Sequence, residues 1–409
     1  MKSFAIYTLT SELHDEAAVG AVTQEFLGSL GIEYDLRGSD YADYGSHALS
    51  IIYVRTGGTE GIFRRLLPTL QAQSARPFYL LTSGKSNSLA ASMEILSFLR
   101  QRNLKGEIIH GSADYISRRL HLLEQAEAAR RRLHGTRLGV IGEPSDWLIS
   151  SHADYAQVQQ RLGIELVDVP MQELLDTLKA QGIEATDSTD TTDSTDTTDS
   201  EYPQTIQQSV PGALRIYEAL KAVVNRHRLQ GFTLRCFDLL TAVRNTGCLA
   251  LAKLNAEGYV AGCEGDAPAM LTMMIVRSLT GISGFQANPS SINPETGEII
   301  FAHCTIPFDM VERYELDTHF ESGIGVGIRG YMKEGPVTIF KVSGDLSRHF
   351  IAEGELVRNQ SKPDLCRTQQ VIRLTDSAQA SYFLTNPIGN HHIIMPGHHR
   401  EVIEELLRC

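Results

Sequence analysis

Short apolar runs alternate with helical stretches through the first two thirds of this sequence, and this alternation limits the possible folds more than any other feature. Each of four early runs is followed by residues with the apolar spacing of a helix. The runs are residues 3–9, 48–54, 77–82 and 107–111. Strands that alternate with helices of about 10–15 residues indicate a parallel sheet with helices on both faces. We therefore predict a doubly wound α/β domain over residues 1–135.

A second series of the same kind begins at residue 137. Its apolar runs are residues 137–142, 164–169, 233–237 and 259–263, which predict a second α/β domain over residues 136–284. From residue 285 the helical spacing fades, and short apolar segments separated by Gly, Pro, Asn and Asp are typical of an antiparallel sheet or barrel. The predicted fold is α/β, with two doubly wound parallel-sheet (Rossmann-like) domains followed by a mainly antiparallel β domain over residues 285–409.

One segment interrupts the second series. Residues 186–200 repeat Thr, Asp and Ser without a single apolar residue, so they cannot bury a face, and we predict a disordered insert. The regular aspartates also suggest calcium, but the segment has no glycine to turn a calcium-binding loop.

The composition excludes several classes of protein. A net charge of −12, from 49 acidic and 37 basic residues, argues against nucleic acid or an anionic membrane as the main partner. No run of roughly 18 apolar residues could span a membrane. The six cysteines form no CxxC pair and predict neither a disulfide framework nor a structural zinc. Because the first residues predict a β-strand and not a signal peptide, we expect a cytoplasmic protein.

Four loops follow predicted strands at the edge where open α/β sheets bind ligands. They are residues 55–61, 83–88, 142–147 and the segment that starts at Asp238. The first two are rich in glycine and hydroxyl groups and contain Arg55 and Lys85, which are candidates for binding a substrate. Both loops are also explained as tight strand–helix turns. Because neither carries a P-loop or a GxGxxG fingerprint, we do not expect ATP or NAD.

The third loop contains the only tryptophan of the chain, Trp147, next to Asp146. Packing of the indole together with capping of the next helix explains this pair, and a wall on which a sugar stacks is the alternative.

Three carboxylates follow two neighbouring predicted strands. Asp238 comes after residues 233–237, and Glu264 and Asp266 come after residues 259–263. Because equivalent ends of adjacent parallel strands lie close together, the three side chains can converge on a divalent cation, which takes oxygen ligands. Helix capping is the alternative for Glu264 and Asp266, since acids are favoured in the first turn of a helix.

Histidines support a metal site. His303 ends a predicted strand, and His391 and His392 come shortly before His398 and His399. Because adjacent strand residues point to opposite faces, His391 and His392 cannot both enter one site. Each histidine taken alone is explained by a structural role. Together with several carboxylates, imidazole ligands suit Mn²⁺ better than Mg²⁺.

The stretches CFDLLT, TGCLALAKLN, CEGDAPAMLTM and AHCTIP, with NHH near the C-terminus, resemble the L-fucose isomerase-like family, which is related to L-fucose and L-arabinose isomerases. GEPSDWLISS resembles the signature of that family's second domain. The resemblance covers most of residues 137–409, and residues 1–135 fit the family's N-terminal domain by layout. It implies a homo-oligomer, a trimer or hexamer, in which the loops 55–61 and 83–88 contact a neighbour's substrate.

In this family a glutamate, a later acid and a late histidine bind Mn²⁺, and the two acids carry protons. By motif, Asp238 stands at the first acidic position, Asp266 resembles the second, and His391, which follows Asn390, resembles the histidine. His303 resembles the further histidine ligand of the arabinose branch. Asp238 replaces the family's glutamate, so its carboxylate is drawn back by one methylene. The resemblance thus implies four metal ligands, of which Asp238 and Asp266 are catalytic.

The function that follows is an Mn²⁺-dependent aldose–ketose isomerase, in which a proton moves between C1 and C2 of a sugar through a cis-enediol. The residues expected to bind the sugar are Glu264, Trp147, Asn390, Arg55 and Lys85. The alternative is a non-catalytic sugar-binding or regulatory protein that retains the isomerase fold. A nucleotide-dependent oxidoreductase is disfavoured by the missing glycine fingerprint.

Overall fold

The structure is a computed structural model that describes residues 4–180 and 202–408, so the Thr/Asp repeat at 186–200 lies outside the described residues. The chain forms two compact units. One runs to Ala128 and includes Glu404–Arg408, and the other comprises Ala129–Ile403. The predicted fold class is confirmed, because the chain contains two parallel sheets and an antiparallel C-terminal barrel. The domain boundaries at 135/136 and 284/285 stay predictions.

The first unit contains a five-stranded parallel sheet with the strand order β2-β1-β3-β4-β5. Its strands are β1 (Phe4–Leu9), β2 (Tyr34–Gly38), β3 (Leu49–Val54), β4 (Phe78–Leu81) and β5 (Gly106–Ile109). The helices are α1 (Glu16–Ser29), α2 (Glu60–Gln73), the short η1 (Lys85–Asn87), α3 (Ser88–Arg100) and α4 (Ala113–Leu133), whose last residues belong to the second unit. Helix α1 starts where it does because the Asp15 carboxylate accepts the N–H groups of Ala17 and Ala18.

The second unit begins with a four-stranded parallel sheet in the order β7-β6-β8-β9. Its strands are β6 (Arg137–Ile141), β7 (Glu165–Val169), β8 (Gly231–Leu234) and β9 (Val260–Cys263). Its helices are α5 (Tyr155–Leu162), α6 (Met171–Ala180), α7 (Gln204–His227), α8 (Asp238–Ala242), α9 (Cys248–Ala256) and α10 (Ala267–Thr280). The chain runs from β6 to β7 on one side and then crosses to β8 on the other. The β6/β8 pair is therefore the topological switch point of this sheet.

The rest of the second unit is a closed antiparallel barrel in the order β10-β11-β16-β15-β14-β17, with a separate hairpin of β12 and β13. The barrel strands are β10 (Phe285–Asn293), β11 (Glu298–His303), β14 (Gly335–Val342), β15 (His349–Gln360), β16 (Thr368–Leu374) and β17 (His392–Pro396). The other elements are η2 (Phe308–Met310), β12 (Arg313–Asp317), β13 (Gly327–Tyr331), η3 (Ser377–Gln379), α11 (Ala380–Thr385) and α12 (Arg400–Leu407), whose last residues belong to the first unit. Inward-facing aromatic and aliphatic side chains such as Phe285, Phe301 and Ile339 form its core.

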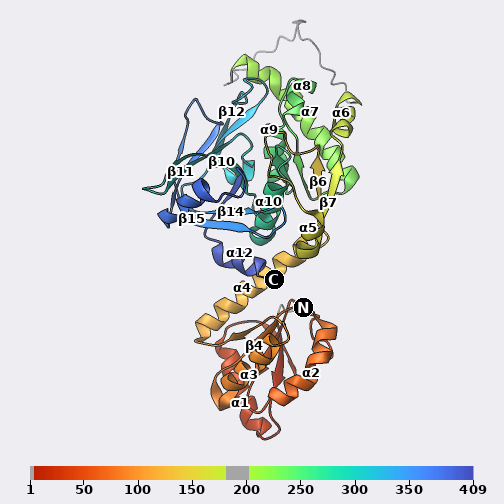
Figure 1. The fold of residues 1–409 in the computed structure, drawn as a ribbon, viewed down its shortest axis with the longest axis vertical. Coiled ribbons are helices and arrows are strands. Elements are labelled where there is room, and N and C mark those ends of the chain that lie inside the picture. Colours follow the sequence, from red (N-terminus) through yellow and green to blue (C-terminus); the bar gives the residue numbers. More distant parts are fainter. Residues whose placement is uncertain (1–3, 181–201, 409) are drawn as a thin grey trace. The chain divides into compact units, whose positions relative to one another are not determined.

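Helix α10 joins the parallel sheet to the barrel. It contacts β8 and β9 of the sheet as well as β10, β14 and β17 of the barrel, and it runs between them in Figure 1. Its first turn lies just after β9, so residues at this point face both layers. In the part of the chain that the structure describes, no helix is long and apolar enough to cross a membrane.

Candidate metal centre

Three buried side chains from separate parts of the second unit converge at the start of α10. Glu264 directly follows β9, His303 ends β11, and His391 directly precedes β17. One ligand atom from each lies within 4.8 Å of the other two. The Nε2 atoms of His303 and of His391 both lie 3.4 Å from Oε1 of Glu264. We call these three residues the ligand triad.

Outer contacts fix the orientation of both imidazole rings. Nδ1 of His391 lies 2.9 Å from Oδ2 of Asp266, and Nδ1 of His303 lies 2.9 Å from the hydroxyl of Thr305. Both rings therefore present Nε2 to Glu264, and Nε2 of His391 is buried without a hydrogen-bond partner. Histidines that bind metals have this arrangement, in which the second ring nitrogen is held by a carboxylate or hydroxyl. The triad fits a divalent transition metal, for which imidazole and carboxylate are suitable ligands.

The charges within the triad are strongly coupled. Burial alone would raise the pKa of Glu264, but His391 and His303 hold that pKa well below its usual range. Burial lowers the pKa of His391, yet the carboxylates of Glu264 and Asp266 outweigh this and raise it to about 9. The pKa of His303 is lowered, chiefly by burial. An ionised carboxylate thus faces two imidazoles. A divalent cation can complete this arrangement by taking the place of the proton on the imidazole.

The backbone at Glu264 takes a conformation that is rare for a residue other than glycine. Its φ is +64°, and Gly265 follows with a φ of +72°. The carbonyl of Glu264 accepts the N–H of Ser145 at 2.9 Å, and its Oε2 accepts the indole N–H of Trp147 at 2.7 Å. Left-handed conformations at such positions persist where the surroundings enforce them, often at functional sites. Here the loop 142–147 holds Glu264 in place.

Asp266 lies behind His391 and not among the three ligand atoms. It is fully buried, and its Oδ1 accepts the N–H of Ala269 at 2.8 Å as the N-cap of α10. Nζ of Lys341 lies 3.5 Å from the same oxygen. Burial raises the pKa of Asp266, but Lys341 and His391 bring it down to about 2. The sequence suggested metal binding and catalysis for Asp266, and both stay predictions; in the structure its carboxylate contacts the ring of His391.

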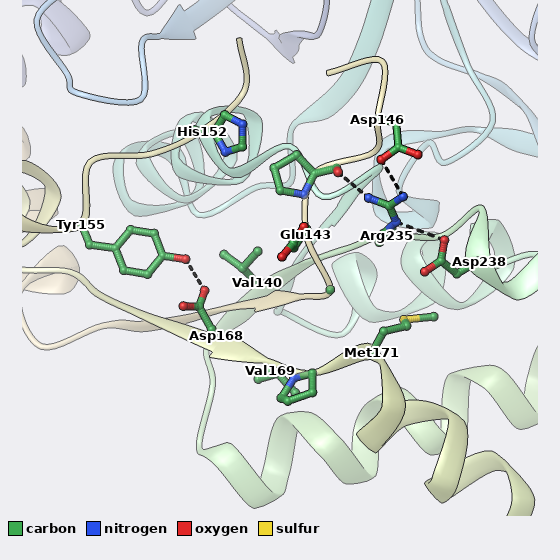
Figure 2. A pocket seen from close by; sticks show the side chains of 13 residues that line it. Val140, Glu143, Asp146, His152, Tyr155, Asp168, Val169, Met171, Arg235 and Asp238 are labelled. Atoms are coloured by element: carbon green, nitrogen blue, oxygen red, sulfur yellow. Dashed lines mark hydrogen bonds and ion pairs between the residues drawn. The ribbon is translucent and has the colours of Figure 1, made fainter. Parts of the chain in front are cut away.

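Asp238 is also separate from the triad in the described residues. Its Oδ1 accepts a hydrogen bond from Nε of Arg235 at 3.1 Å, and its side chain lines a different pocket, drawn in Figure 2. Three residues separate Asp238 from the end of β8, whereas Glu264 follows β9 at once. The sequence predicts equivalent positions for Asp238 and Glu264, each directly after a strand. Glu264 faces the two histidines, and the expected binding of the sugar by Glu264 stays a prediction.

Trp147 and Asn390 were also expected to bind the sugar. Trp147 is 52% exposed, and its ring meets the edge of Phe237 with 4.7 Å between ring centroids. Its indole N–H is used by Glu264, so its contact with the triad is a hydrogen bond. Asn390 is exposed, and its carbonyl lies 3.1 Å from Nδ1 of His392.

Arg55 and Lys85 belong to the first unit, and both are paired within it. The guanidinium of Arg55 is buried and donates to both carboxylate oxygens of Glu16, at 2.8 and 2.7 Å. Nζ of Lys85 lies 3.6 Å from the carboxylate of Glu25. Substrate binding by these two residues stays a prediction.

Comparison with known proteins relates this chain to the L-fucose/L-arabinose isomerase family. Residues 149–281 match the model of the L-arabinose isomerase central domain. A sulfoquinovose isomerase of Clostridium sp. is 23% identical over 223 residues, which are 54% of this chain and 48% of that protein. Sulfoquinovose isomerases of Priestia aryabhattai and Priestia megaterium are each 23% identical over 266 residues, which are 63% of this chain and 59% of those proteins. The chain thus matches about half to three fifths of the length of these relatives.

Proposed function

Because this chain is related to the L-fucose/L-arabinose isomerase family, we propose that it is a metal-dependent aldose–ketose isomerase. The observation that carries the proposal is the ligand triad, in which His303 and His391 both direct Nε2 to one carboxylate oxygen of Glu264. The triad combines the residue after β9, the last residue of β11 and the residue before β17, and outer contacts orient both rings. Such preorganisation is expected of a metal site and not of a chance group of histidines.

The cofactor that we propose is Mn²⁺, since two imidazoles and one carboxylate suit it better than Mg²⁺. Glu264, His303 and His391 would hold it. When bound, the cation supplies polarisation of the sugar's carbonyl oxygen, which makes the neighbouring C–H proton easier to remove.

The residues of the chain supply orientation and proton transfer. The reaction moves one proton between C1 and C2 through a cis-enediol and needs a group that accepts and returns it. Glu264 is the carboxylate of the triad, and the Trp147 N–H holds its second oxygen. Asp238 remains our proposal for a second acid, because its side chain is 38% exposed and can meet a substrate. We assign Asp266 a positioning role through His391.

The substrate that we propose is an aldose, and the relatives named sulfoquinovose isomerase make a sulfonated hexose the first candidate. We further propose a homo-oligomer, a trimer or hexamer, in the cytoplasm, with the loops 55–61 and 83–88 contacting a neighbour's substrate. The alternative of a non-catalytic sugar-binding protein predicts that the purified protein takes up no Mn²⁺.

The test is an assay of the purified full-length chain after removal of metals with EDTA. With Mn²⁺ added back, we expect ketose formation from sulfoquinovose, L-fucose or L-arabinose. Glu264→Gln should lower the rate by about 10²–10⁴-fold, because it removes the anionic ligand of the proposed metal and with it several kcal/mol of carbonyl polarisation. Glu257→Gln is a matched control, because Glu257 is paired with Lys221 on the surface of the parallel-sheet region. Ketose formation in EDTA, or full activity of Glu264→Gln, would contradict the proposal.

A further inference from the structure

A large pocket opens at the switch point of the second parallel sheet, away from the ligand triad. It has a volume of about 800 Å³, and residues that follow β6, β7 and β8 line it. Figure 2 shows Glu143, Asp168 and Arg235 around it. None of the three triad residues lines this pocket, whereas Asp238, our proposed second acid, does. Ligands of open α/β sheets bind at this place, outside the carboxyl ends of the strands where the strand order reverses.

The charges of the pocket disfavour an anion. Arg235 is its one guanidinium, and each of its three nitrogens already donates a hydrogen bond within the protein. The acceptors are Asp238 at 3.1 Å, the carbonyl of Pro144 at 2.6 Å and Asp146 at 2.9 Å. The lining also contains the carboxylates of Glu143 and Asp168. A phosphate or sulfonate would therefore meet four carboxylates, Glu143, Asp146, Asp168 and Asp238, against one guanidinium whose charge Asp146 and Asp238 already offset.

The rest of the lining suits hydroxyl groups on a carbon skeleton. Val140, Val169 and Met171 provide apolar surface beside the carboxylates, and the hydroxyl of Tyr155 donates to Asp168. Carboxylates accept hydrogen bonds from hydroxyls, and an apolar wall covers the C–H face of a sugar-like ligand. We propose that this pocket binds a neutral polyhydroxylated small molecule, and that the loop 142–147 couples its occupancy to Glu264.

The loop is a wall shared by the pocket and the triad. Glu143, Pro144 and Asp146 line the pocket, whereas Ser145 N and Trp147 Nε1 bind the backbone and the carboxylate of Glu264. Gly265 packs so tightly on the loop that a Cβ there would lie 2.5 Å from the carbonyl oxygen of Glu143. Because the loop packs closely against Gly265, a ligand that moves the loop also moves Ser145 and Trp147, the hydrogen-bond partners of Glu264.

The test uses sorbitol, which lacks a carbonyl group and so cannot be isomerised. Trp147 is the only tryptophan of the chain, so its emission reports on the loop directly. We expect saturable binding of sorbitol to the metal-free protein by calorimetry, together with a shift in Trp147 emission. The His391→Ala variant should bind sorbitol equally well, because binding does not involve the triad. This makes the result independent of whether the chain is an isomerase.

Variants and a matched ligand identify the site. The double variant Glu143→Gln/Asp168→Asn should weaken sorbitol binding about tenfold or more, through weaker hydrogen bonds to the hydroxyls. Asp176→Asn, an exposed residue of α6 outside the pocket, should leave it unchanged. Sorbitol 6-phosphate should bind far more weakly than sorbitol. Absence of saturable binding, equal binding of the phosphate, binding of spermidine in place of sorbitol, or an unchanged double variant overturns the site. Binding without a change in Trp147 emission overturns the coupling.

Discussion

Nδ1 of His391 lies 2.9 Å from Oδ2 of Asp266, and both side chains are fully buried. The carboxylate thus fixes which nitrogen of the ring faces Glu264. Partners of this kind, one step removed from the metal, typically contribute 10–100-fold to metal affinity. We therefore predict that Asp266→Asn weakens Mn²⁺ binding by about that factor, measured by calorimetry on EDTA-treated protein, and lowers isomerase activity with it.

Asp266 also faces Lys341, whose side chain is only 1% exposed. Asp266→Asn leaves this ammonium buried without a counter-charge, which typically costs about 3–5 kcal/mol of stability. The double variant Asp266→Asn/Lys341→Met should recover most of that loss in urea unfolding while its Mn²⁺ affinity stays low. Recovery of metal affinity together with stability would show that Asp266 acts on the fold alone.

His391 and His392 are neighbours in the sequence, and substituting each in turn tests which of them binds the metal. His391→Ala should reduce Mn²⁺ uptake below detection, because it removes a ligand, whereas His392→Ala should retain stoichiometric metal. His392 is equally buried, but Nε2 of its ring lies 3.0 Å from the hydroxyl of Tyr382 and not in the triad. Metal content measured by atomic emission after dialysis against Mn²⁺ decides this. Equal loss of metal in both variants would contradict the assignment.

The architecture was predictable because its signal is local. Alternation of strand and helix runs specifies parallel sheets, and the change in spacing after residue 285 marks the barrel. The alternation of strand faces also separated His391 from its neighbour, as the contacts of His392 confirm. These features depend on the order of residues along the chain and not on contacts between distant ones.

The roles of the carboxylates were harder to predict, because they depend on offsets of two or three residues at strand ends. Glu264 faces the histidines through a left-handed backbone conformation that nothing in its own side chain requires. Asp266, two residues later, is turned to the helix N-terminus and to Lys341, a residue of β14 that is distant in the sequence. Gly265 beside Glu264 was the one local signal, since glycine permits the left-handed turn.

A substitution at Gly265 tests whether the loop 142–147 supports Glu264. Gly265→Ala adds a Cβ at a φ of +72°, and that atom would lie 2.5 Å from the carbonyl oxygen of Glu143. We expect a loss of about 1–3 kcal/mol in the free energy of unfolding and weaker Mn²⁺ binding. Gly281→Ala is the control, because its φ is +75° and nothing lies within 4 Å of the added atom. It should lose stability by backbone strain alone, with unchanged metal affinity. Equal metal affinity in both variants would refute the support by the loop.

The pH dependence of stability can be tested at Glu173, which is not part of the ligand triad. This residue of α6 forms ion pairs with Arg226 at 2.5 Å and with His227 at 3.0 Å. Burial raises the pKa of Glu173, but His227 and Arg226 outweigh it and the net pKa is lowered. Because the folded-state pKa lies below the unfolded one, the stabilisation is complete above the unfolded value and is lost as the pH falls through the folded value.

Glu173→Gln should therefore lower the free energy of unfolding by about 1 kcal/mol near pH 6, a figure reduced for partial exposure of the ion pairs. The difference from the unsubstituted protein should shrink as the pH falls below about 4, where the carboxylate is lost in the unfolded chain and then in the folded one. Urea unfolding near pH 6 and below about pH 4 measures this difference in the free energy of unfolding. Glu165→Gln is the control, because Glu165 is 55% exposed and lies 3.4 Å from Arg137, so its removal should change stability by less than about 0.5 kcal/mol. A penalty for Glu173→Gln that is the same at both pH values would mean that packing, and not the ion pairs, accounts for it.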